Sequence, residues 1–299
     1  MRLFEQVSAL RAYLRGVRTE GDGKEIGFVP TMGALHEGHA SLIRKAKSDC
    51  DVVVVSVFVN PTQFGLGEDL AAYPRSISSD QQLCSNENTD ALFIPSIEEM
   101  YPAGFQTVVE VTEIASTLEG AHRPGHFAGV ATVVLKLLNI VQPDRIYMGQ
   151  KDYQQGLVIE RMTHDLNLQT EVVSVPTVRA ADGVALSSRN TYLSPEERRA
   201  ATVLYKSMQT ARDAVATGEA DAHALLREMQ AVIAAEPLAR ADYVCLVDPA
   251  TLKPVTGISN AATLAVLAVR IGKTRLIDNM LIAPPGVSAV RPRLAHYER

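Results

Sequence analysis

The run from Val52 to Val59, which reads VVVVSVFV, constrains the fold of this chain more than any other segment. It is almost wholly apolar and rich in β-branched residues, as expected of a strand that is covered on both faces. Strands of this kind are typical of parallel sheets that carry helices on both sides. The run therefore predicts a parallel sheet.

The first two thirds of the chain alternates strand and helix signals around this run. Short apolar segments predict further strands, and longer segments with helical periodicity predict helices. The predicted strands are 26–29, 92–95, 107–111, 145–148 and 171–175, and the predicted helices are 38–47, 128–141 and 153–166. This order gives βαβ units in an α/β fold, and ligands of such sheets bind beyond the carboxyl ends of the strands.

The last third of the chain predicts a small α+β lid domain that begins near Val178. The ranges 196–217 and 222–236 are rich in helix formers, and strand signals follow at 243–247, 264–269 and 275–280. A chain of 299 residues, 46% of them hydrophobic, can bury one sizeable core and a smaller second one. We therefore expect two domains, residues 1–177 and 178–299.

The composition argues against several kinds of partner. The net charge is −5 and no run of lysine or arginine stands out, so we expect no nucleic-acid binding. The start of the chain lacks an apolar signal core, and no stretch reaches the length of a membrane span. Cys50, Cys84 and Cys245 are odd in number and far apart, which favours a reducing compartment over a disulfide scaffold. These features predict a cytoplasmic protein without membrane association.

The most informative segment for function runs from Phe28 to His39, FVPTMGALHEGH, where an apolar strand turns into a helix. The first turn of a helix carries unpaired N–H groups and the positive end of the helix dipole, so phosphate oxygens bind well there. Gly33 and Gly38 allow a close approach of the backbone to a ligand, and His36 and His39 add side-chain donors. The segment predicts a nucleotide phosphate site at which a histidine can transfer a proton.

Two alternatives apply to this histidine pair. It could be half of a metal site, but zinc needs three or four ligands, and Pro124 and Gly125 prevent His122 and His126 from sharing a helical face. It could also consist of ordinary polar loop residues, and the pair alone does not decide against this. The common nucleotide motifs offer no competing site, because the chain has neither a complete P-loop nor a Gly-x-Gly-x-x-Gly run after its first predicted strand.

Polar side chains also follow two further predicted strands. Asn60 and Gln63 come after the valine-rich run, and their amides can bind hydroxyl and carboxylate oxygens. Lys151 and Asp152 follow the strand 145–148, where they can neutralise phosphate charge and accept hydrogen bonds from a ribose. The alternatives are a turn cap beside an exposed glutamine in the first case and a capped helix start with a surface lysine in the second.

A third phosphate signal lies at 186–190, LSSRN, after the turn-rich segment 180–183. Two hydroxyls and Arg189 on a flexible loop can close over a triphosphate. The segment could also be a linker that leads to a helix N-cap at Ser194. The two interpretations are compatible, because a mobile loop between domains suits a lid.

Taken in order, these motifs resemble the pantoate–β-alanine ligase family. The resemblance covers nearly the whole chain and rests on HEGH at 36–39, NPTQFG at 60–65, YPR at 73–75, HFAGV at 126–130, KDYQQ at 151–155, SSRN at 187–190 and GKTRLIDN at 272–279. The His-x-Gly-His signature is shared with the wider HIGH-signature nucleotidyltransferase superfamily. The resemblance implies a Rossmann-like nucleotidyltransferase domain, a homodimer, and the substrates ATP, pantoate and β-alanine with Mg²⁺.

The resemblance also implies roles for individual residues. It implies that His39 donates a proton, that His36 and Lys151 act with it in catalysis, and that Gln63 and Gln155 bind pantoate, with Gln63 also near the β-alanine site. The implied ATP-binding residues are Met32, Gly33, Ala34, Leu35, His36, Glu37, Gly38, His39, Gly149, Gln150, Lys151, Asp152, Val178, Leu186, Ser187, Ser188 and Arg189.

The chain departs slightly from the family pattern at two places. Leu186 stands where some relatives have methionine. The segment Ser78-Ser79-Asp80 is poorer in carboxylates than the acidic cluster of some members, which leaves Asp80 as the candidate contact for Mg²⁺. Two other function classes remain open at this point: a transferase that stops at nucleotide transfer, and a nucleotide-binding module without catalytic activity.

Overall fold

The computed structural model describes residues 1–19, 23–65, 67–258 and 260–290 and divides into two compact units. The first unit comprises residues 1–150 and 154–176, and the second comprises 151–153 together with the described residues from Thr177 onward. The main division falls after Pro176, next to the predicted boundary at 177. The short segment 151–153 belongs to the second unit, although it lies inside the predicted first domain.

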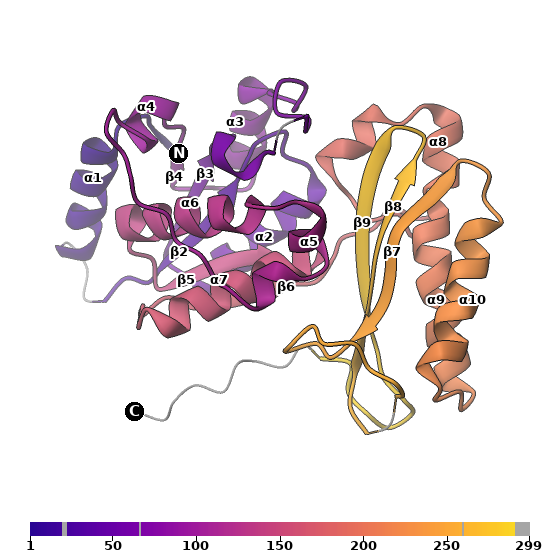
Figure 1. The fold of residues 1–299 in the computed structure, drawn as a ribbon. Helices are drawn as coiled ribbons and strands as arrows, with labels where there is room; N and C mark the ends of the chain where they lie inside the picture. The colour runs from indigo at the N-terminus through magenta and orange to yellow at the C-terminus, as the bar shows by residue number, and fades with distance from the viewer. Residues whose placement is uncertain (20–22, 66, 259, 291–299) are drawn as a thin grey trace. The chain divides into compact units, whose positions relative to one another are not determined.

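The first unit contains a six-stranded sheet in which every neighbouring pair is parallel, as predicted. The strand order is β1-β4-β3-β2-β5-β6, and all of these strands except β1 are labelled in Figure 1. The strands are β1 (Arg2–Phe4), β2 (Ile26–Thr31), β3 (Val52–Val57), β4 (Ala91–Phe93), β5 (Arg145–Gly149) and β6 (Glu171–Val175). Strand β2 lies in the middle, where Phe28 is paired with Val54 on one side and Ile146 on the other.

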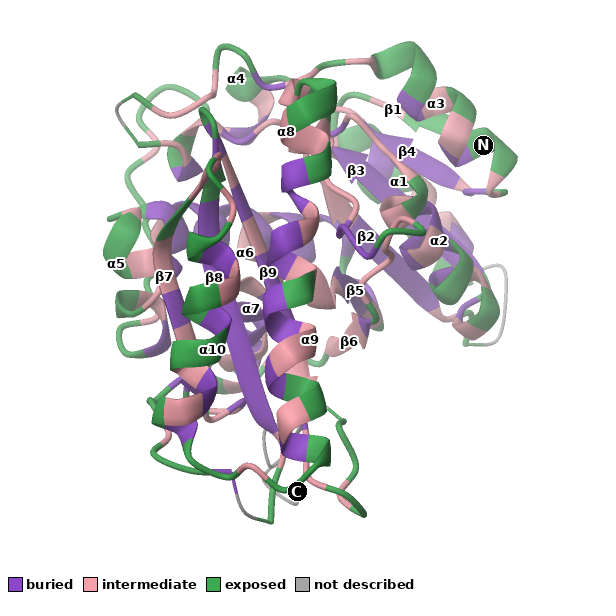
Figure 2. Ribbon diagram, turned by 90° about the vertical axis from the view of Figure 1, so that its right-hand side faces the viewer, coloured by how far each residue is buried: buried purple, intermediate pink, exposed green. Residues whose placement is uncertain are grey.

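Helices on both faces of this sheet bury its strands. Helix α2 (Glu37–Asp49) places Leu42, Ile43 and Ala46 in a core with alternate residues of β2 and β3. Helix α6 (His126–Val141) lies on the opposite face beside α1 (Val7–Thr19) (Figure 1). All six residues of β3 are buried, and the sheet is buried over most of its length (Figure 2). The valine-rich run therefore has the two-sided environment that its composition predicts.

Shorter helices connect these elements in the first unit. They are α3 (Ile77–Asn86), α4 (Ile97–Met100), α5 (Glu119–His122) and α7 (Tyr153–Asp165), with the 3₁₀ turns η1 (Pro61–Gln63) and η2 (Ile114–Ser116). The turn η3 (Gln150–Asp152) and the first residue of α7 include the segment 151–153, which belongs to the second unit. Two of the turns, η1 and η3, follow the carboxyl ends of β3 and β5. The polar segment that begins at Asn60 therefore lies at the edge of the sheet where α/β proteins bind ligands.

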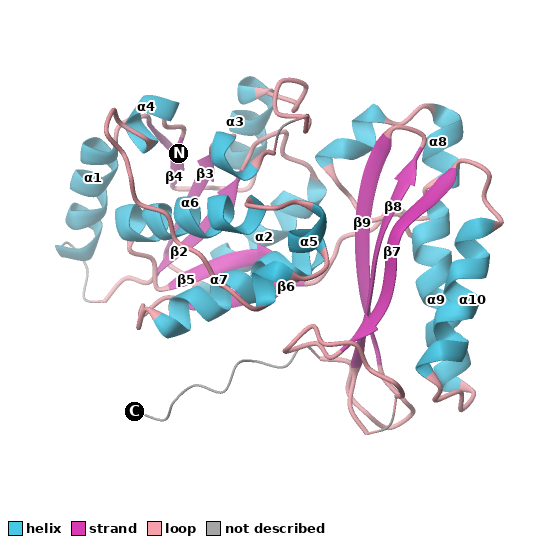
Figure 3. Cartoon of the chain, viewed as in Figure 1, coloured by secondary structure: helices cyan, strands magenta, loops and turns pink. Residues whose placement is uncertain are grey.

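The second unit packs three helices on a three-stranded antiparallel sheet (Figure 3). Its elements are η4 (Ser188–Tyr192), α8 (Pro195–Ala200), α9 (Thr202–Ala216), α10 (Ala222–Ala234), β7 (Ala239–Val247), β8 (Thr263–Ile271) and β9 (Thr274–Ile282). Leu204 and Met208 of α9 and Leu225 of α10 share one core with Leu267 of β8. This unit has the α+β composition predicted for the end of the chain.

Two predicted elements differ in the structure. The range 107–111 is not a strand. Its Val109 N–H donates to Thr132 Oγ1 of α6 at 2.9 Å, and Val108 is 68% exposed. The segment is therefore bound to α6 and does not join the sheet. The predicted helix 196–217 is two helices, because ψ of −18° at Ala201 makes a tighter turn than an α-helix allows. No described helix has the length and apolar character needed to cross a bilayer.

Candidate functional site

The loop between β2 and α2 carries the predicted phosphate site. Its backbone is unusual, because Gly33 and Ala34 both have positive φ, at 88° and 50°. His36 then caps α2: its Nδ1 accepts a hydrogen bond from the Gly38 N–H at 3.1 Å. His39 Nδ1 accepts in return from the His36 N–H at 3.2 Å, which completes a capping box.

These two contacts define the tautomers of the imidazoles. A ring nitrogen that accepts from a backbone N–H carries no proton, so the neutral forms of His36 and His39 are protonated on Nε2. The ring centroids lie 4.2 Å apart, so the two imidazoles form one compact pair. Such a pair suits an anion at the start of a helix.

The structure explains why this loop has glycine at positions 33 and 38, which the sequence alone did not reveal. A Cβ at Gly38 would lie 2.8 Å from Cε1 of His36, so glycine allows the histidine ring to fold over the first turn. A Cβ at Gly33 would lie 2.9 Å from Asp80 Oδ2 and 2.9 Å from Val57 Cγ1. The prediction that both glycines admit a ligand is therefore incomplete, because each also admits a side chain of the protein itself.

Asp80 contacts this loop through its carboxylate. The residue is 1% exposed, and its two carboxylate oxygens accept from the Ala34 N–H at 3.0 Å and the Leu35 N–H at 2.7 Å. Among the described residues, no group of three or more His, Cys, Asp or Glu side chains is arranged to hold a metal ion. These contacts anchor the loop, and the role of Asp80 as a ligand of Mg²⁺ stays a prediction.

Gln63 is buried, and a network of side chains orients its amide. Asn60 accepts from the Thr62 N–H and from the Tyr101 hydroxyl, so its Nδ2 is a donor, and it donates to Gln63 Oε1 at 3.1 Å. Gln63 Nε2 then faces Met32 Sδ at 3.1 Å. The alternative of an exposed glutamine is wrong, because Gln63 is 7% exposed, although Asn60 does cap η1. The network presents Gln63 as an N–H donor.

The main chain of Gln63 is held by residues to which the sequence assigned no role. His126 Nδ1 donates to the Gln63 carbonyl at 2.8 Å, and its Nε2 accepts from Arg123 Nη1 at 3.1 Å. Glu68 pairs with Arg123 through two hydrogen bonds, at 2.6 and 2.7 Å. Burial, reinforced by the charge of Arg123, lowers the pKa of His126 to about 4, so its ring is neutral. The spacing Arg-x-x-His just before a predicted helix is the signal that could have revealed this contact.

Helix α6 approaches this segment closely at Gly129. A Cβ at Gly129 would lie 2.3 Å from the Thr62 carbonyl oxygen and 2.7 Å from Gln63 Cα, both of which are backbone atoms. The Gly129 carbonyl also accepts from Asn60 Nδ2 at 3.1 Å. The HFAGV motif therefore serves as a platform for η1, and its glycine is required by the close approach of two backbones.

The second unit contains the remaining predicted phosphate residues. Val178 and Leu186 are paired through the Leu186 N–H, which donates to the Val178 carbonyl at 3.0 Å. Ser187 caps η4, because its Oγ accepts from the Arg189 N–H at 3.3 Å. Asn279 Nδ2 donates to the Lys151 carbonyl at 2.7 Å, which ties the segment 151–153 to β9.

Asp278 and Arg179 form a buried ion pair beside this segment, which sequence reasoning missed. Arg179 contacts both oxygens of the carboxylate, at 2.6 and 2.9 Å, and Asp278 is 4% exposed. Burial raises the pKa of Asp278, whereas Arg179 and the charge of Lys151 oppose the shift. Within the second unit, Lys151 therefore lies in the field of a buried carboxylate.

The comparisons with known proteins identify the family. A family model described as pantoate-beta-alanine ligase matches residues 2–281. The chain belongs to the pantoate–β-alanine ligase family. A pantothenate synthetase from Moorella thermoacetica is 52% identical over 282 residues, which cover 94% of this chain and 99% of the relative.

Solved structures of the ligase family have the same fold. The crystal structure of pantothenate synthetase from Thermus thermophilus has a TM-score of 0.90 at 47% identity and covers 95% of this chain and 100% of that one. That of the ligase from Francisella tularensis, complexed with β-γ ATP and β-alanine, has a TM-score of 0.78 at 37% identity, with coverage of 94% and 97%. The protein is therefore a ligase, and the predicted Rossmann-like domain with a smaller α+β domain is confirmed.

Within this ligase the predicted site residues fall into two sets. Residues 32–39, Gln63, Asp80, Gly149, Gln150 and Gln155 lie in the first unit, and Lys151, Asp152, Val178 and residues 186–189 lie in the second. Contacts join part of each set: Asp80 binds the loop 33–35 and Gln63 faces Met32 in the first unit, and Leu186 is paired with Val178 in the second. That both sets bind one ATP molecule stays a prediction.

Proposed function

We propose that this ligase joins pantoate to β-alanine in two steps through a pantoyl adenylate. In the first step a pantoate carboxylate oxygen attacks the α-phosphorus of ATP, the bond to the bridging oxygen breaks, and pyrophosphate leaves. In the second step the β-alanine amine attacks the acyl carbon, AMP leaves with the electron pair of the C–O bond, and the amine loses a proton. The products are pantothenate, AMP and pyrophosphate.

The single observation that carries this proposal is the imidazole pair at the start of α2. Pyrophosphate gains negative charge as it leaves, and donors that are already oriented lower the barrier because they need no reorganisation. Nε2–H of His36 and of His39 are such donors, since backbone N–H groups hold both Nδ1 atoms. We assign the proton donation to His39. The Francisella relative, crystallised with β-γ ATP and β-alanine, supports ATP as the nucleotide and β-alanine as the amine.

The other predicted residues have roles that fit their chemistry. We propose that Lys151 and Arg189 neutralise phosphate charge, that Ser187 and Ser188 hydrogen-bond to phosphate, and that residues 149–152 and Val178 bind the nucleoside. Gln63 can donate its oriented Nε2–H to a pantoate oxygen, and Gln155 is its proposed partner. Little covalent chemistry falls to these groups, so their contribution is positioning and electrostatics.

Mg²⁺ that accompanies ATP is held largely by phosphate oxygens and water, and it would supply charge neutralisation there. The described part of the first unit gives it no cluster of carboxylates, and the oxygens of Asp80 already bind backbone N–H groups. We therefore assign no step of the reaction to a protein-bound metal ion.

The experiment is ATP–pyrophosphate exchange with pantoate, followed by AMP release with and without β-alanine. We expect exchange without β-alanine, and stimulation of AMP release when it is added. His39→Ala and Lys151→Ala should each lower exchange on the order of 10²-fold or more. The control is His223→Ala, which removes an exposed histidine of α10. Exchange within a few-fold of the unmodified enzyme in both site variants would remove these assignments, and AMP release that ignores β-alanine would favour a simple nucleotidyltransferase.

We also propose that the ligase is a homodimer and acts in the cytoplasm. The support for the dimer is the family resemblance, and the support for the compartment is the composition, with Cys50, Cys84 and Cys245 all present as free thiols. Light scattering coupled to size-exclusion chromatography tests the dimer, and a monomeric mass at micromolar concentration would contradict it.

A further inference from the structure

We infer that Asp80 is a positioning residue for the adenylation step: its buried carboxylate holds residues 33–35 in the backbone conformation that places the two histidines. The inference replaces the metal-binding role predicted from the sequence. It rests on the proposed function, because residues 32–39 must bind the reacting phosphates for their position to matter.

The contact between Asp80 and the loop is complete and excludes water. Asp80 lies in α3, and the loop is 45 residues earlier in the sequence, so the contact is tertiary. Each carboxylate oxygen accepts one backbone N–H, at 3.0 Å from Ala34 and 2.7 Å from Leu35, and the residue is 1% exposed. Hydrogen bonds to an ionised acceptor are stronger than neutral ones, and two of them fix both the distance and the orientation of the loop.

The loop needs such an anchor because its conformation is intrinsically unfavourable. Ala34 has φ of 50°, a left-handed conformation that residues with a Cβ avoid. Gly33 before it has φ of 88°, and no Cβ would fit there beside Asp80 Oδ2. Two successive left-handed residues turn their neighbouring N–H groups towards α3, where the carboxylate meets them. Without the carboxylate, the two partly buried N–H groups would lose the acceptors that they have in this structure.

The consequence for the site follows along the chain. Leu35 directly precedes His36, whose φ of −140° and ψ of −180° set the start of α2 and the capping box with His39. Rotation of the peptides at 34 and 35 therefore moves both imidazoles. The same geometry shows that the N–H groups of Ala34 and Leu35 donate to Asp80, and those of His36 and Gly38 donate to the capping box. The histidine side chains are therefore the phosphate donors that this loop offers.

The test compares Asp80→Asn with a matched control, Asp144→Asn. The asparagine keeps the volume but turns one acceptor into a donor that faces a backbone N–H. Asp144 makes the same kind of contact at the other end of β2, where its Oδ2 accepts from the Ile26 N–H at 2.7 Å. We expect Asp80→Asn to lower kcat/KM for ATP in pyrophosphate exchange on the order of 10-fold or more, and the control to stay within about 2-fold.

A second readout follows the contact itself. Amide hydrogen exchange at Ala34 and Leu35, measured by NMR, should become faster in Asp80→Asn and stay unchanged in Asp144→Asn. Gly33→Ala disturbs the same contact from the side of the loop. It should likewise lower kcat/KM for ATP and speed up amide exchange at Ala34 and Leu35. Unchanged amide exchange at both positions in Asp80→Asn would overturn the inference even if activity fell.

A magnesium titration separates positioning from metal binding. If Asp80 holds the loop, saturating Mg²⁺ does not restore the activity of Asp80→Asn, whereas restoration by Mg²⁺ would overturn the inference in favour of a metal ligand. The result for His39→Ala separates this inference from the proposed function. Normal ATP–pyrophosphate exchange in both variants would overturn the proposed phosphate-binding function of the loop. Normal ATP–pyrophosphate exchange in Asp80→Asn alone would overturn only the inference that Asp80 positions the loop.

Discussion

His126 is a buried histidine whose protonation is incompatible with its contacts. Its Nδ1–H donates to the Gln63 carbonyl, and its Nε2 accepts from Arg123, so the neutral ring already uses both nitrogens. A proton added to Nε2 would face the guanidinium. Burial and Arg123 lower the pKa to about 4, and the nearby charges of Glu68 and Glu119 offset the shift only in part.

This shift predicts how stability depends on pH. Between the ordinary histidine pKa near 6.5 and about 4, the unfolded chain binds a proton at this residue and the folded chain does not. Stability therefore rises with pH through this window, and it is lost as pH falls from 7.5 to 5, by about 2 kcal/mol from this residue. Urea unfolding at the two pH values measures the loss.

The control for this prediction is His126→Gln, which keeps a donor near the Gln63 carbonyl and does not titrate. Its loss of stability between pH 7.5 and 5 should be smaller than that of the unmodified protein by about the same 2 kcal/mol. Equal losses in the two proteins would show that His126 does not control the acid sensitivity of this segment.

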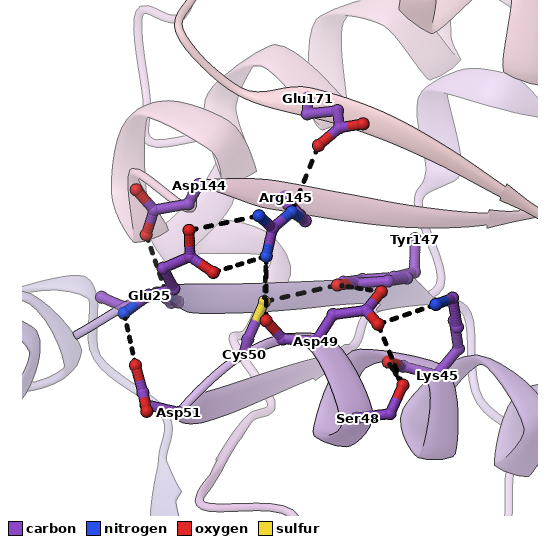
Figure 4. Close-up of polar contacts among 11 residues, drawn as sticks. Glu25, Lys45, Ser48, Asp49, Cys50, Asp51, Asp144, Arg145, Tyr147 and Glu171 are labelled. Carbon is purple, nitrogen blue, oxygen red and sulfur yellow. Dashed lines mark hydrogen bonds and ion pairs between the residues drawn. The ribbon is translucent and has the colours of Figure 1, made fainter.

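At the scale of elements, one arginine joins three segments at the amino edge of the parallel sheet. Arg145 at the start of β5 contacts Glu25 before β2, Glu171 at the start of β6, and the carbonyl of Asp49 at the end of α2 (Figure 4). Tyr147 follows it on the same strand, and its hydroxyl contacts Asp49 and Cys50. These contacts raise the pKa of Arg145 and keep it charged.

We predict that Arg145→Met lowers stability by about 1–2 kcal/mol without changing catalysis. The estimate is modest because Glu25 and Glu171 are partly exposed and solvent screens their charges. Activity should stay within about 2-fold, because the network lies at the opposite ends of the strands from the proposed phosphate site. Arg161→Met, which removes an exposed pair with Asp165, should cost under about 0.5 kcal/mol. Urea midpoints in low and high salt measure both effects, and equal losses in the two variants would contradict the prediction.

The elements that were predicted correctly have a clear local pattern in the sequence. Strands β2, β3, β4, β5 and β6 are short, mostly apolar runs, and the helix predicted at 128–141 is close to α6. The segment 107–111 is also a mostly apolar run, but the Thr132 hydroxyl of α6 accepts a hydrogen bond from its backbone. This contact is a tertiary effect that a local pattern does not reveal. Strand β1 has only three residues, too few for a periodicity signal.

The candidate site was predicted only where its residues are close in sequence. The histidines, their glycines and Gln63 stand in short motifs directly after predicted strands. The rule that α/β sheets bind ligands beyond the carboxyl ends of their strands was therefore enough to find them. The partners that orient them come from elsewhere: Asp80 from α3, Arg123 from the end of α5, and His126 from the start of α6. Such partners have no local signature, because their role depends on which elements the fold brings together.

At the scale of the molecule, each unit has its own hydrophobic core. The core of the second unit is formed by residues between Val184 and Ile282, and it includes both long helices and all three antiparallel strands. The segment 151–153 adds polar contacts, from Asn279 to the Lys151 carbonyl and from the Tyr153 hydroxyl to the Pro249 carbonyl at 3.0 Å. Apolar burial dominates folding free energy, so the core should suffice without this segment.

We therefore predict that a fragment of residues 177–290 folds on its own and shows no ligase activity. It should give a dispersed NMR spectrum and one cooperative urea transition, because it retains the whole of its core cluster. A shorter fragment that begins at Thr202 lacks Val184, Ala200 and Ala201, which are all buried in that core, so its midpoint should be lower. A spectrum without dispersion for the longer fragment would mean that the segment 151–153 or the first unit is required for the second unit to fold. In that case the two cores would not be energetically separate, and stability measured on the full chain would report on both together.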